Sequence, residues 1–169
     1  MTEAREIELG PISDRLGGVD LVLIGATDPE AMNRHTDECR FRGIPFVADP
    51  SQQLAWLDGD GIKQLVDGAA YLFSNDYEAG LIEQKTGWSA DEVLSRVGVR
   101  VTTLGNDGAR IEVAGQPTVE VTCPPEELKA DPTGVGDAFR AGFLAGLAWE
   151  LSHERCAQIG SLLATYVIE

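Results

Sequence analysis

Residues 131–137 read DPTGVGD, and a run of small residues, AFRAGF, follows at once at 138–143. Two glycines one residue apart, Gly134 and Gly136, let the backbone approach a ligand closely. The N–H groups of Gly134, Val135 and Gly136 would lie at the start of a helix, where they lack helical partners and the helix dipole is positive. Such a place binds phosphate. The stretch therefore predicts an anion site at a helix N-terminus.

The same stretch ends on a candidate general base. Asp137 would lie in the first turn of that helix, where a carboxylate stays ionised. An ionised carboxylate there can accept the proton of an attacking alcohol. A G-x-G at a helix start is common in unrelated folds, so the motif alone is weak evidence. Asp131 and Asp137 on its two sides and the small-residue helix strengthen the phosphate interpretation.

Two further motifs lie upstream. Residues 75–78 read NDYE and residues 103–108 read TLGNDG. Taken separately, each has a plainer interpretation: Asn75 and Glu78 suit a helix cap and a first-turn acid, and 103–108 suits an ordinary turn after a strand. Their order along the chain, ahead of DPTGVGD, favours a shared site.

Together the three motifs resemble the ribokinase/PfkB family of sugar and nucleoside kinases. The C-terminal signature DTxGxGD of that family is matched except at Pro132, and 75–78 and 103–108 match its N-x-x-E and T-x-G-x-x-G motifs. The runs DLVLIGATDPEAM, ADPSQQLAWL and DPTGVGDAFRAGFLAG are most similar to adenosine kinases of the bacterial, actinobacterial type. The resemblance extends from Val19 to Glu169.

The resemblance implies a phosphotransferase that moves the γ-phosphate of ATP, or another nucleoside triphosphate, to the primary hydroxyl of a nucleoside, with adenosine the first choice. A ribose- or fructose-type sugar kinase of the same family is one alternative, and a non-catalytic nucleotide-binding module is another. A dinucleotide-dependent oxidoreductase is disfavoured, because the G-x-G lies late in the chain and no G-x-G-x-x-G follows an early strand.

The resemblance also assigns roles to residues. Asp137 would be the base and the amides of Gly134, Val135 and Gly136 would stabilise the transferring phosphoryl group. Magnesium would be held partly through Asn75 and Glu78, and a monovalent cation, usually potassium, through Asp131 and Thr133. Gln52 and Gln53 would join Asp137 in facing the nucleoside, since an amide both donates and accepts. The nucleotide would be bound by Asn75, Thr103, Leu104, Gly105, Asn106, Asp107 and Gly108.

The order of the elements predicts an α/β fold with a mostly parallel sheet flanked by helices. Strands are expected at 20–24, 44–48, 70–73 and 99–103, with an antiparallel hairpin at one sheet edge from 109–113 and 118–122. Residues 20–24 form an apolar run that suggests burial on both faces. Helices are expected from Asp28 to Gly43, after Asn75, after Ser89, and over 134–149 and 152–168. Ligands gather at the carboxyl ends of such strands.

Composition fits one packed cytoplasmic domain of 169 residues, 43% of them hydrophobic. The net charge of −15 disfavours nucleic acid and anionic membranes as partners. Three scattered cysteines, Cys39, Cys123 and Cys156, predict reduced thiols rather than a disulfide framework or a zinc site. No apolar run is long enough to span a bilayer. By the resemblance, a homodimer is possible in full-length family members.

Residues 1–169 are expected to be a partial ribokinase-like kinase domain. The family's N-terminal half brings a substrate-binding aspartate, a glycine pair and a small β lid, and we find no counterpart of these before Val19. The segment that completes the adenine pocket would lie beyond Glu169. We therefore expect residues 1–169 alone not to consume ATP in an adenosine-dependent manner, and an exposed sheet edge to favour association.

Overall fold

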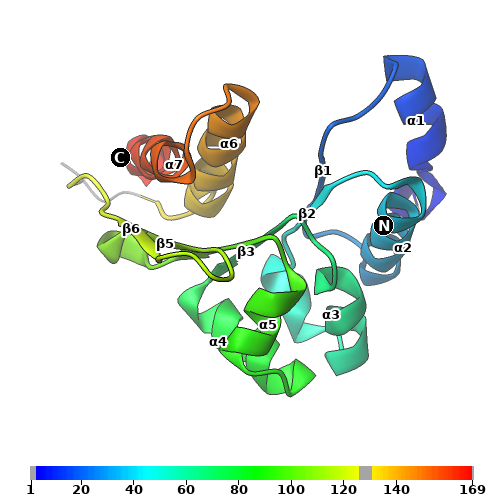
Figure 1. Cartoon of the computed structure of the whole chain (residues 1–169), viewed down its shortest axis with the longest axis horizontal. Coiled ribbons are helices and arrows are strands. Elements are labelled where there is room, and N and C mark those ends of the chain that lie inside the picture. The colour runs from blue at the N-terminus through cyan, green and yellow to red at the C-terminus, as the bar shows by residue number, and fades with distance from the viewer. Residues whose placement is uncertain (1–2, 126–130, 169) are drawn as a thin grey trace. The chain divides into compact units, whose positions relative to one another are not determined.

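A computed structural model describes residues 3–125 and 131–168 of the chain. The chain divides into two compact units, Met1–Arg100 and Val101–Glu169. Unit 1 alternates parallel strands with helices, and unit 2 carries an antiparallel hairpin and two long helices (Figure 1). The predicted α/β class, with mostly parallel strands, flanking helices and one hairpin, is confirmed.

Unit 1 is built on parallel strands. These are β1 (Val22–Ile24), β2 (Phe46–Ala48) and β3 (Tyr71–Asn75), with β2 paired in parallel to both of the others. A fourth strand, β4 (Val99–Thr103), begins in this unit. All four strands coincide with the runs predicted from sequence. The carboxyl ends of β2 and β3 therefore lie at one edge, where the chain turns into its next segments.

Burial along the strands differs from expectation in one place. Val47 in β2 lies opposite Leu23 on one side and Tyr71 on the other, and every residue of β2 is buried. Leu23 in β1, however, is 46% exposed. The expected burial of this run on both faces is wrong for β1, because Leu23 is exposed while Ile24, whose side chain points to the opposite face, is buried.

Helices and short 3₁₀ turns connect the strands of unit 1. The predicted start of the second helix is confirmed: the Asp28 carboxylate accepts a hydrogen bond from the Ala31 amide, and the helix ends at Gly43 in a left-handed conformation. The sequence did not assign the two N-terminal segments or the helix after β2. The elements are η1 (Glu3–Glu6), α1 (Leu9–Leu16), α2 (Pro29–Arg42), η2 (Ser51–Ala55), α3 (Gly59–Val66), α4 (Asp76–Thr86) and α5 (Ala90–Arg96).

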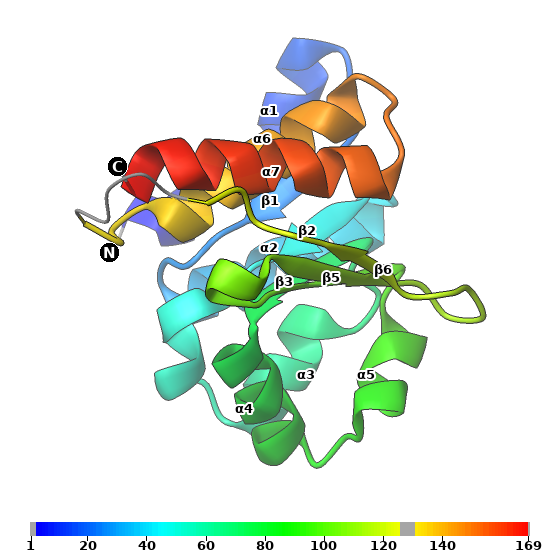
Figure 2. The same cartoon turned by 90° about the vertical axis from the view of Figure 1, so that its left-hand side faces the viewer.

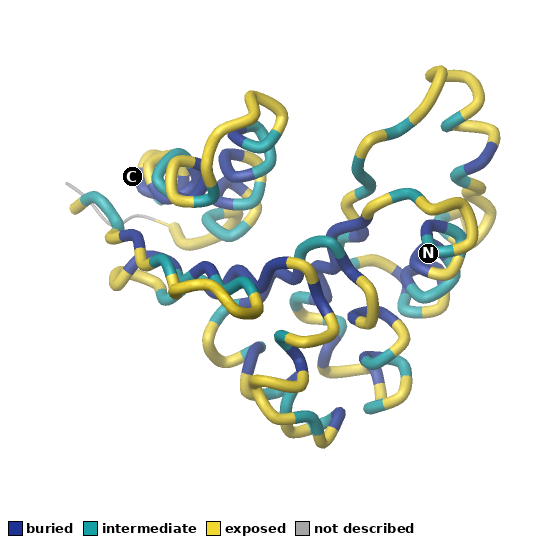
Figure 3. The backbone as a smooth tube through the Cα atoms, in the orientation of Figure 1, coloured by how far each residue is buried: buried dark blue, intermediate teal, exposed yellow. Residues whose placement is uncertain are grey.

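The core of unit 1 lies between its strands and helices α2 to α5 (Figure 3). Fully burying side chains of this size contributes about 1.5–3 kcal/mol each, so this cluster is the main source of stability in the unit. Its largest buried members include Met32, Phe46, Leu54, Ile62, Leu65, Leu72 and Ile82.

Unit 2 begins with the end of β4, which is followed by a turn and a hairpin. The turn η3 (Gly105–Asp107) leads into β5 (Ala109–Glu112), which pairs antiparallel with β6 (Val119–Val121). The predicted hairpin is thus confirmed. Helices α6 (Val135–Ala148) and α7 (His153–Ile168) follow, as predicted, and lie side by side in unit 2 (Figure 2).

The small residues of α6 serve close helix packing. A Cβ built on Gly142 would lie 2.8 Å from the Cα of Gly160 in α7, and one built on Gly160 would lie 2.7 Å from the carbonyl oxygen of Phe139. The two backbones are therefore too close for side chains between them. The run AFRAGFLAG thus follows the phosphate motif for a packing reason, because it lets α7 fix the position of α6.

Cys39, Cys123 and Cys156 are free thiols, as predicted. Burial raises the pKa of the Cys39 thiol to about 11, so this group stays protonated at neutral pH. Over residues 3–125 and 131–168, no helix combines the length and the apolar character needed to cross a bilayer.

Candidate active site

The first turn of α6 presents free backbone donors. Gly134 is the N-cap, with φ 82° and ψ −5°, and no side chain caps the helix. Because a left-handed conformation costs an L side chain roughly 1–2 kcal/mol, glycine is strongly favoured here. The Val135 amide donates to Pro132 O at 3.3 Å, so it is not the free donor expected. Among the described residues, the amides of Gly136 and Asp137 have no hydrogen-bond partner.

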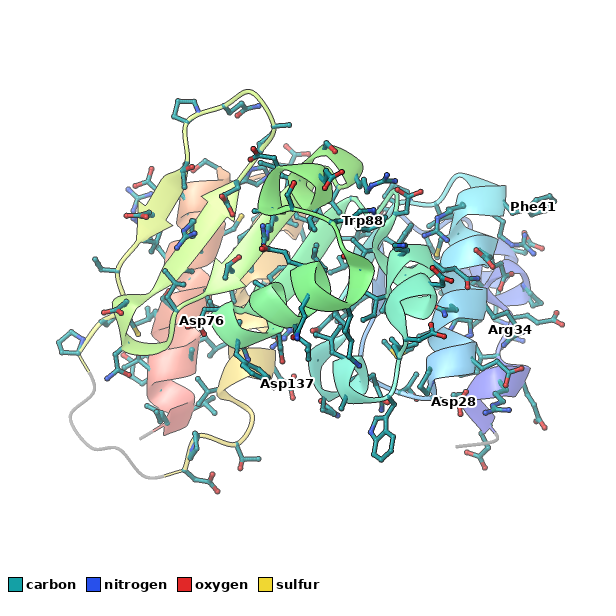
Figure 4. The ribbon with its side chains drawn as sticks, turned by 90° about the horizontal axis from the view of Figure 1, so that it is seen from below. Asp28, Arg34, Phe41, Asp76, Trp88 and Asp137 are labelled. Carbon is teal, nitrogen blue, oxygen red and sulfur yellow. The ribbon has the colours of Figure 1, made fainter. Side chains whose placement is uncertain are left out.

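Asp137 lies exposed in that first turn (Figure 4). Its carboxylate has no hydrogen bond or ion pair to any described residue. A carboxylate next to two open amides, at the positive end of a 14-residue helix, can take a proton while the amides hold a neighbouring anion. The arrangement fits the base and anion-site roles predicted for this stretch.

Arg140 is a candidate that the sequence reasoning missed. A Cβ built on Gly136 would lie 2.5 Å from Nη1 of Arg140, so the guanidinium covers the first turn of α6. The signal was present in the sequence, since Arg140 follows Gly136 by four positions and thus shares its helix face. Gly134 is glycine because its φ is positive, whereas Gly136 is glycine because a side chain there would collide with the Arg140 guanidinium.

Asp131 and Thr133, the predicted monovalent-cation pair, contact each other. The Thr133 amide donates to Asp131 Oδ1 at 2.9 Å. Hydrogen bonds from the amide and side chain of Thr133 lower the pKa of the Asp131 carboxyl. The carboxylate is therefore ionised and fixed in the loop that enters α6. Binding of a monovalent cation by this pair stays a prediction.

The predicted nucleotide loop forms a closed turn after β4. The Leu104 amide donates to Gly108 O at 2.8 Å, and the Gly108 amide donates to Gly105 O at 3.1 Å. Gly105 has φ 61° and open space around its Cα, as a residue that a ligand approaches must have. Gly108 is glycine for another reason, since a Cβ there would lie 1.9 Å from the carbonyl oxygen of Val121 in β6.

In unit 1, Asn75 and Glu78 form a capping box at the start of α4. The Glu78 amide donates to Asn75 Oδ1 at 2.7 Å, and the Asn75 amide donates to Glu78 Oε2 at 2.9 Å. The plain helix-cap interpretation is therefore correct for these two residues. Any binding of a ligand by Asn75 or Glu78 would come in addition to this capping role.

Magnesium fits this turn only with help from a nucleotide. Residues 3–125 and 131–168 hold no group of three or more His, Cys, Asp or Glu side chains that could form a metal cage. Magnesium, however, usually binds through one or two carboxylates together with water and phosphate oxygens. Glu78 and the exposed Asp76 of the same turn supply hard oxygen donors of this kind (Figure 4).

The predicted acceptor residues lie on η2, directly after β2. Gln52 is exposed and Gln53 half-buried. Ahead of them Asp49 is only 4% exposed and accepts a hydrogen bond from the Ser51 hydroxyl at 2.8 Å. Ser51 has φ 42°, which is strained for any residue but glycine.

Each unit therefore gathers part of the predicted set. The glutamines follow β2, and Asn75 and Glu78 follow β3, so unit 1 brings them to the carboxyl ends of two paired parallel strands. Unit 2 contributes the glycine turn after β4 and the open start of α6. Sites at the carboxyl ends of strands and at a helix N-terminus are typical of α/β proteins that bind phosphorylated ligands.

This architecture matches that of α/β proteins that bind phosphorylated ligands, the class to which small-molecule kinases belong. A sequence profile of the pfkB family carbohydrate kinases matches residues 12–169. The chain belongs to that family, whose members are phosphotransferases.

Individual relatives of this chain are also kinases of small molecules. The nucleoside kinase of Methanocaldococcus jannaschii is 30% identical over 150 residues, which are 89% of this chain and 49% of that protein. The 2-dehydro-3-deoxygluconokinase of Escherichia coli K12 is 28% identical over 168 residues, and the match covers 91% of this chain and 53% of that protein. The solved structure of Burkholderia thailandensis nucleoside kinase in complex with inosine superposes with a TM-score of 0.85 at 37% identity, covering 89% of this chain and 50% of that one.

The chain spans about half the length of the curated relatives it matches. The fold and the family follow from these similarities. The activity of the whole protein, its acceptor and its partners are matters for proposal.

Proposed function

We propose that this chain carries the phosphoryl-transfer site of a nucleoside kinase, which moves the γ-phosphate of ATP to the primary hydroxyl of a nucleoside. The observation that carries the proposal is the start of α6, where Asp137 lies beside two amides that have no partner among the described residues. A phosphate bound there would receive donors that are already aimed, at no cost of rearrangement.

Each group at this helix start has a distinct task. Asp137 accepts the proton of the attacking hydroxyl, while the amides of Gly136 and Asp137 hold the transferring phosphoryl group. Arg140, which covers the same turn, adds positive charge to the site. This charge matters because the chain as a whole carries −15 and would otherwise repel a nucleotide.

The nucleotide and its metal involve three further segments. Thr103–Gly108 would form the nucleotide loop, with ligand approach at the open Gly105. Asn75 and Glu78 would contribute to a magnesium site, and bound magnesium would neutralise charge on the transferred phosphate. Asp131 and Thr133 would hold a monovalent cation, as the family resemblance implies.

For the acceptor we propose a purine nucleoside, with Gln52 and Gln53 facing it. Support comes from the sequence similarity to bacterial adenosine kinases and from the B. thailandensis enzyme, whose structure was solved with inosine. The relative that is a 2-dehydro-3-deoxygluconokinase favours the second candidate, a sugar kinase with the same chemistry. Either activity would suit a cytoplasmic enzyme. Phosphorylation of a purine nucleoside would serve purine salvage. The proposal also allows a homodimer of the full-length protein.

Calorimetry on the chain separates these functions. Titrations with MgADP, adenosine, inosine and ribose should show binding of MgADP and of a nucleoside. Binding of MgADP alone would identify a nucleotide-binding module, and a preference for ribose a sugar kinase. A folded chain that binds none of the four would contradict the proposal. An assay of nucleoside-dependent ADP release then measures whether residues 1–169 transfer phosphate.

A further inference from the structure

One large aromatic side chain beside the proposed acceptor residues has no role so far. Trp56 is 80% exposed, although it follows β2 and η2 directly. Single exposed apolar side chains are common on protein surfaces. What distinguishes Trp56 is its place in the chain, directly after the two glutamines that we propose to face the acceptor, because an aromatic ring can stack on a flat ligand.

The backbone places Trp56 on the same face as Gln53. The Trp56 amide donates to Gln53 O at 3.0 Å, which is the i to i−3 bond of a 3₁₀ turn. In that geometry, residues three apart lie one above the other. Trp56 therefore follows Gln53 by one turn of the backbone, so the same short segment carries an aromatic ring and an amide that can both donate and accept. An aromatic face next to an amide suits a purine base, which offers a flat surface and a polar edge.

The segment that carries both side chains is held at each end. Leu54 and Leu57, on either side of Trp56, are 1% and 6% exposed and anchor it in the core. The Lys85 ammonium in α4 donates to the carbonyl oxygens of Leu54 at 2.5 Å and Leu57 at 2.8 Å, and also reaches Ala55 at 3.3 Å. Trp56 thus stands exposed on a fixed backbone.

The entry to the segment is strained as well as fixed. Ser51 adopts φ 42° while its hydroxyl donates to the buried Asp49 carboxylate at 2.8 Å. A strained residue persists where the surroundings impose it, and such positions cluster at ligand sites. Strain before Gln52 and anchors around Trp56 both indicate a segment built to present side chains.

We infer that Trp56 stacks on the base of the acceptor nucleoside and so selects nucleosides over free sugars. The inference rests on the proposed function and names the residue that decides its acceptor class. Ribose has no base and gains nothing from the ring. A nucleoside gains the stacking contribution, which for bases on aromatic side chains corresponds to about 5- to 150-fold in affinity.

Calorimetry of four proteins tests this inference: the wild-type chain, Trp56→Ala, Trp56→Phe and Trp149→Ala. Trp149 is a matched control, since it is also an exposed tryptophan but follows α6 in unit 2. We expect Trp56→Ala to weaken adenosine or inosine binding about 5- to 150-fold, and Trp56→Phe, which keeps a ring, to restore most of it. MgADP and ribose should bind all four proteins equally, and thermal unfolding should be unchanged.

Tryptophan fluorescence gives a second readout. Nucleoside should quench the wild-type and Trp149→Phe proteins alike, and should not quench Trp56→Phe. A Trp56→Ala protein with wild-type nucleoside affinity would overturn this inference and leave the proposed function intact. The same conclusion would hold if the substitution changed the oligomeric state of the chain but not its nucleoside affinity. A wild-type chain that binds MgADP but no nucleoside would overturn the acceptor assignment together with this inference. Failure to bind even MgADP would overturn the proposed function itself.

Discussion

Two helices of this chain begin in opposite ways. At α4 the Asn75 side chain accepts a hydrogen bond from the Glu78 amide at 2.7 Å, and the Glu78 carboxylate accepts one from the Asn75 amide at 2.9 Å. At α6 the cap is Gly134, which has no side chain to offer, and the amides of Gly136 and Asp137 have no partner among the described residues. The first helix start is closed by its own residues and the second is open.

The difference separates a completed helix cap from the helix start that we propose as a ligand site. Free amides at a helix start cost stability unless something binds them, and a capping residue contributes about 1 kcal/mol. The α6 start is capped by glycine, which costs only about a few tenths of a kcal/mol relative to a side-chain cap, and it leaves two amides for the anion that we propose to bind there. The α4 start keeps its side-chain cap, so a ligand there would have to add to a completed cap.

The largest expected effect is at the open helix. In a preparation that transfers phosphate, Asp137→Asn should lower kcat roughly 10²- to 10⁴-fold, because the amide cannot accept the proton of the hydroxyl. MgADP affinity, measured by calorimetry, should change little. Asp91→Asn is the matched control, since Asp91 lies in the first turn of α5, where Ser89 caps the helix. Near-normal turnover of Asp137→Asn would remove the base from the mechanism.

The open cap itself is tested by Gly134→Ala. A Cβ at φ 82° costs roughly 1–2 kcal/mol, so either the protein loses that stability or the loop moves and the amides lose their aim. We expect a lower melting temperature and about tenfold weaker MgADP binding. Gly80→Ala, in an open helical position of α4, should instead stabilise the chain by about 0.5–1 kcal/mol. Unchanged MgADP affinity in a folded Gly134→Ala protein would argue against the phosphate site.

The closed helix is tested by two substitutions of its cap. Asn75→Ala should reduce stability by about 1 kcal/mol in chemical denaturation, and Asn75→Ser should preserve most of it, because serine also caps helices. Ser89→Ala at the similar capping box of α5 is the control and should cost as much. If Asn75 has only a capping role, Asn75→Ser will bind MgADP as the wild type does. Weaker magnesium-dependent binding in that variant would establish the ligand role.

The smallest effect concerns acid sensitivity in the loop before α6. Hydrogen bonds from Thr133 lower the folded-state pKa of Asp131 below its ordinary 3.8. The carboxylate therefore contributes stability that is present above pH 3.8 and is lost as the pH falls through the lower folded value. Melting curves of wild type and Asp131→Asn between pH 7 and pH 3 should converge in acid. A constant difference across that range would contradict this origin.

Much of the fold could be predicted because local patterns carry it. The four predicted strands, the start of α2 at Asp28 and the antiparallel hairpin follow from apolar runs, caps and turn residues. The burial predicted for β1 failed at Leu23, since burial depends on what covers each face of the sheet and not on the apolar run itself. The segments η1, α1 and α3 escaped prediction, because their positions depend on what they pack against.

The sequence by itself determined the family, the order of its motifs and the glycines before α6, because residue type and spacing are enough to specify backbone conformations and chemical groups. Only the tertiary structure decided how those groups are used. It showed that the Val135 amide is already hydrogen-bonded and that Arg140 covers the first turn of α6. It also showed that the Val121 carbonyl leaves no room for a side chain at Gly108, and that Asn75 and Glu78 form a capping box. These outcomes depend on distances between atoms, which a linear spacing does not fix.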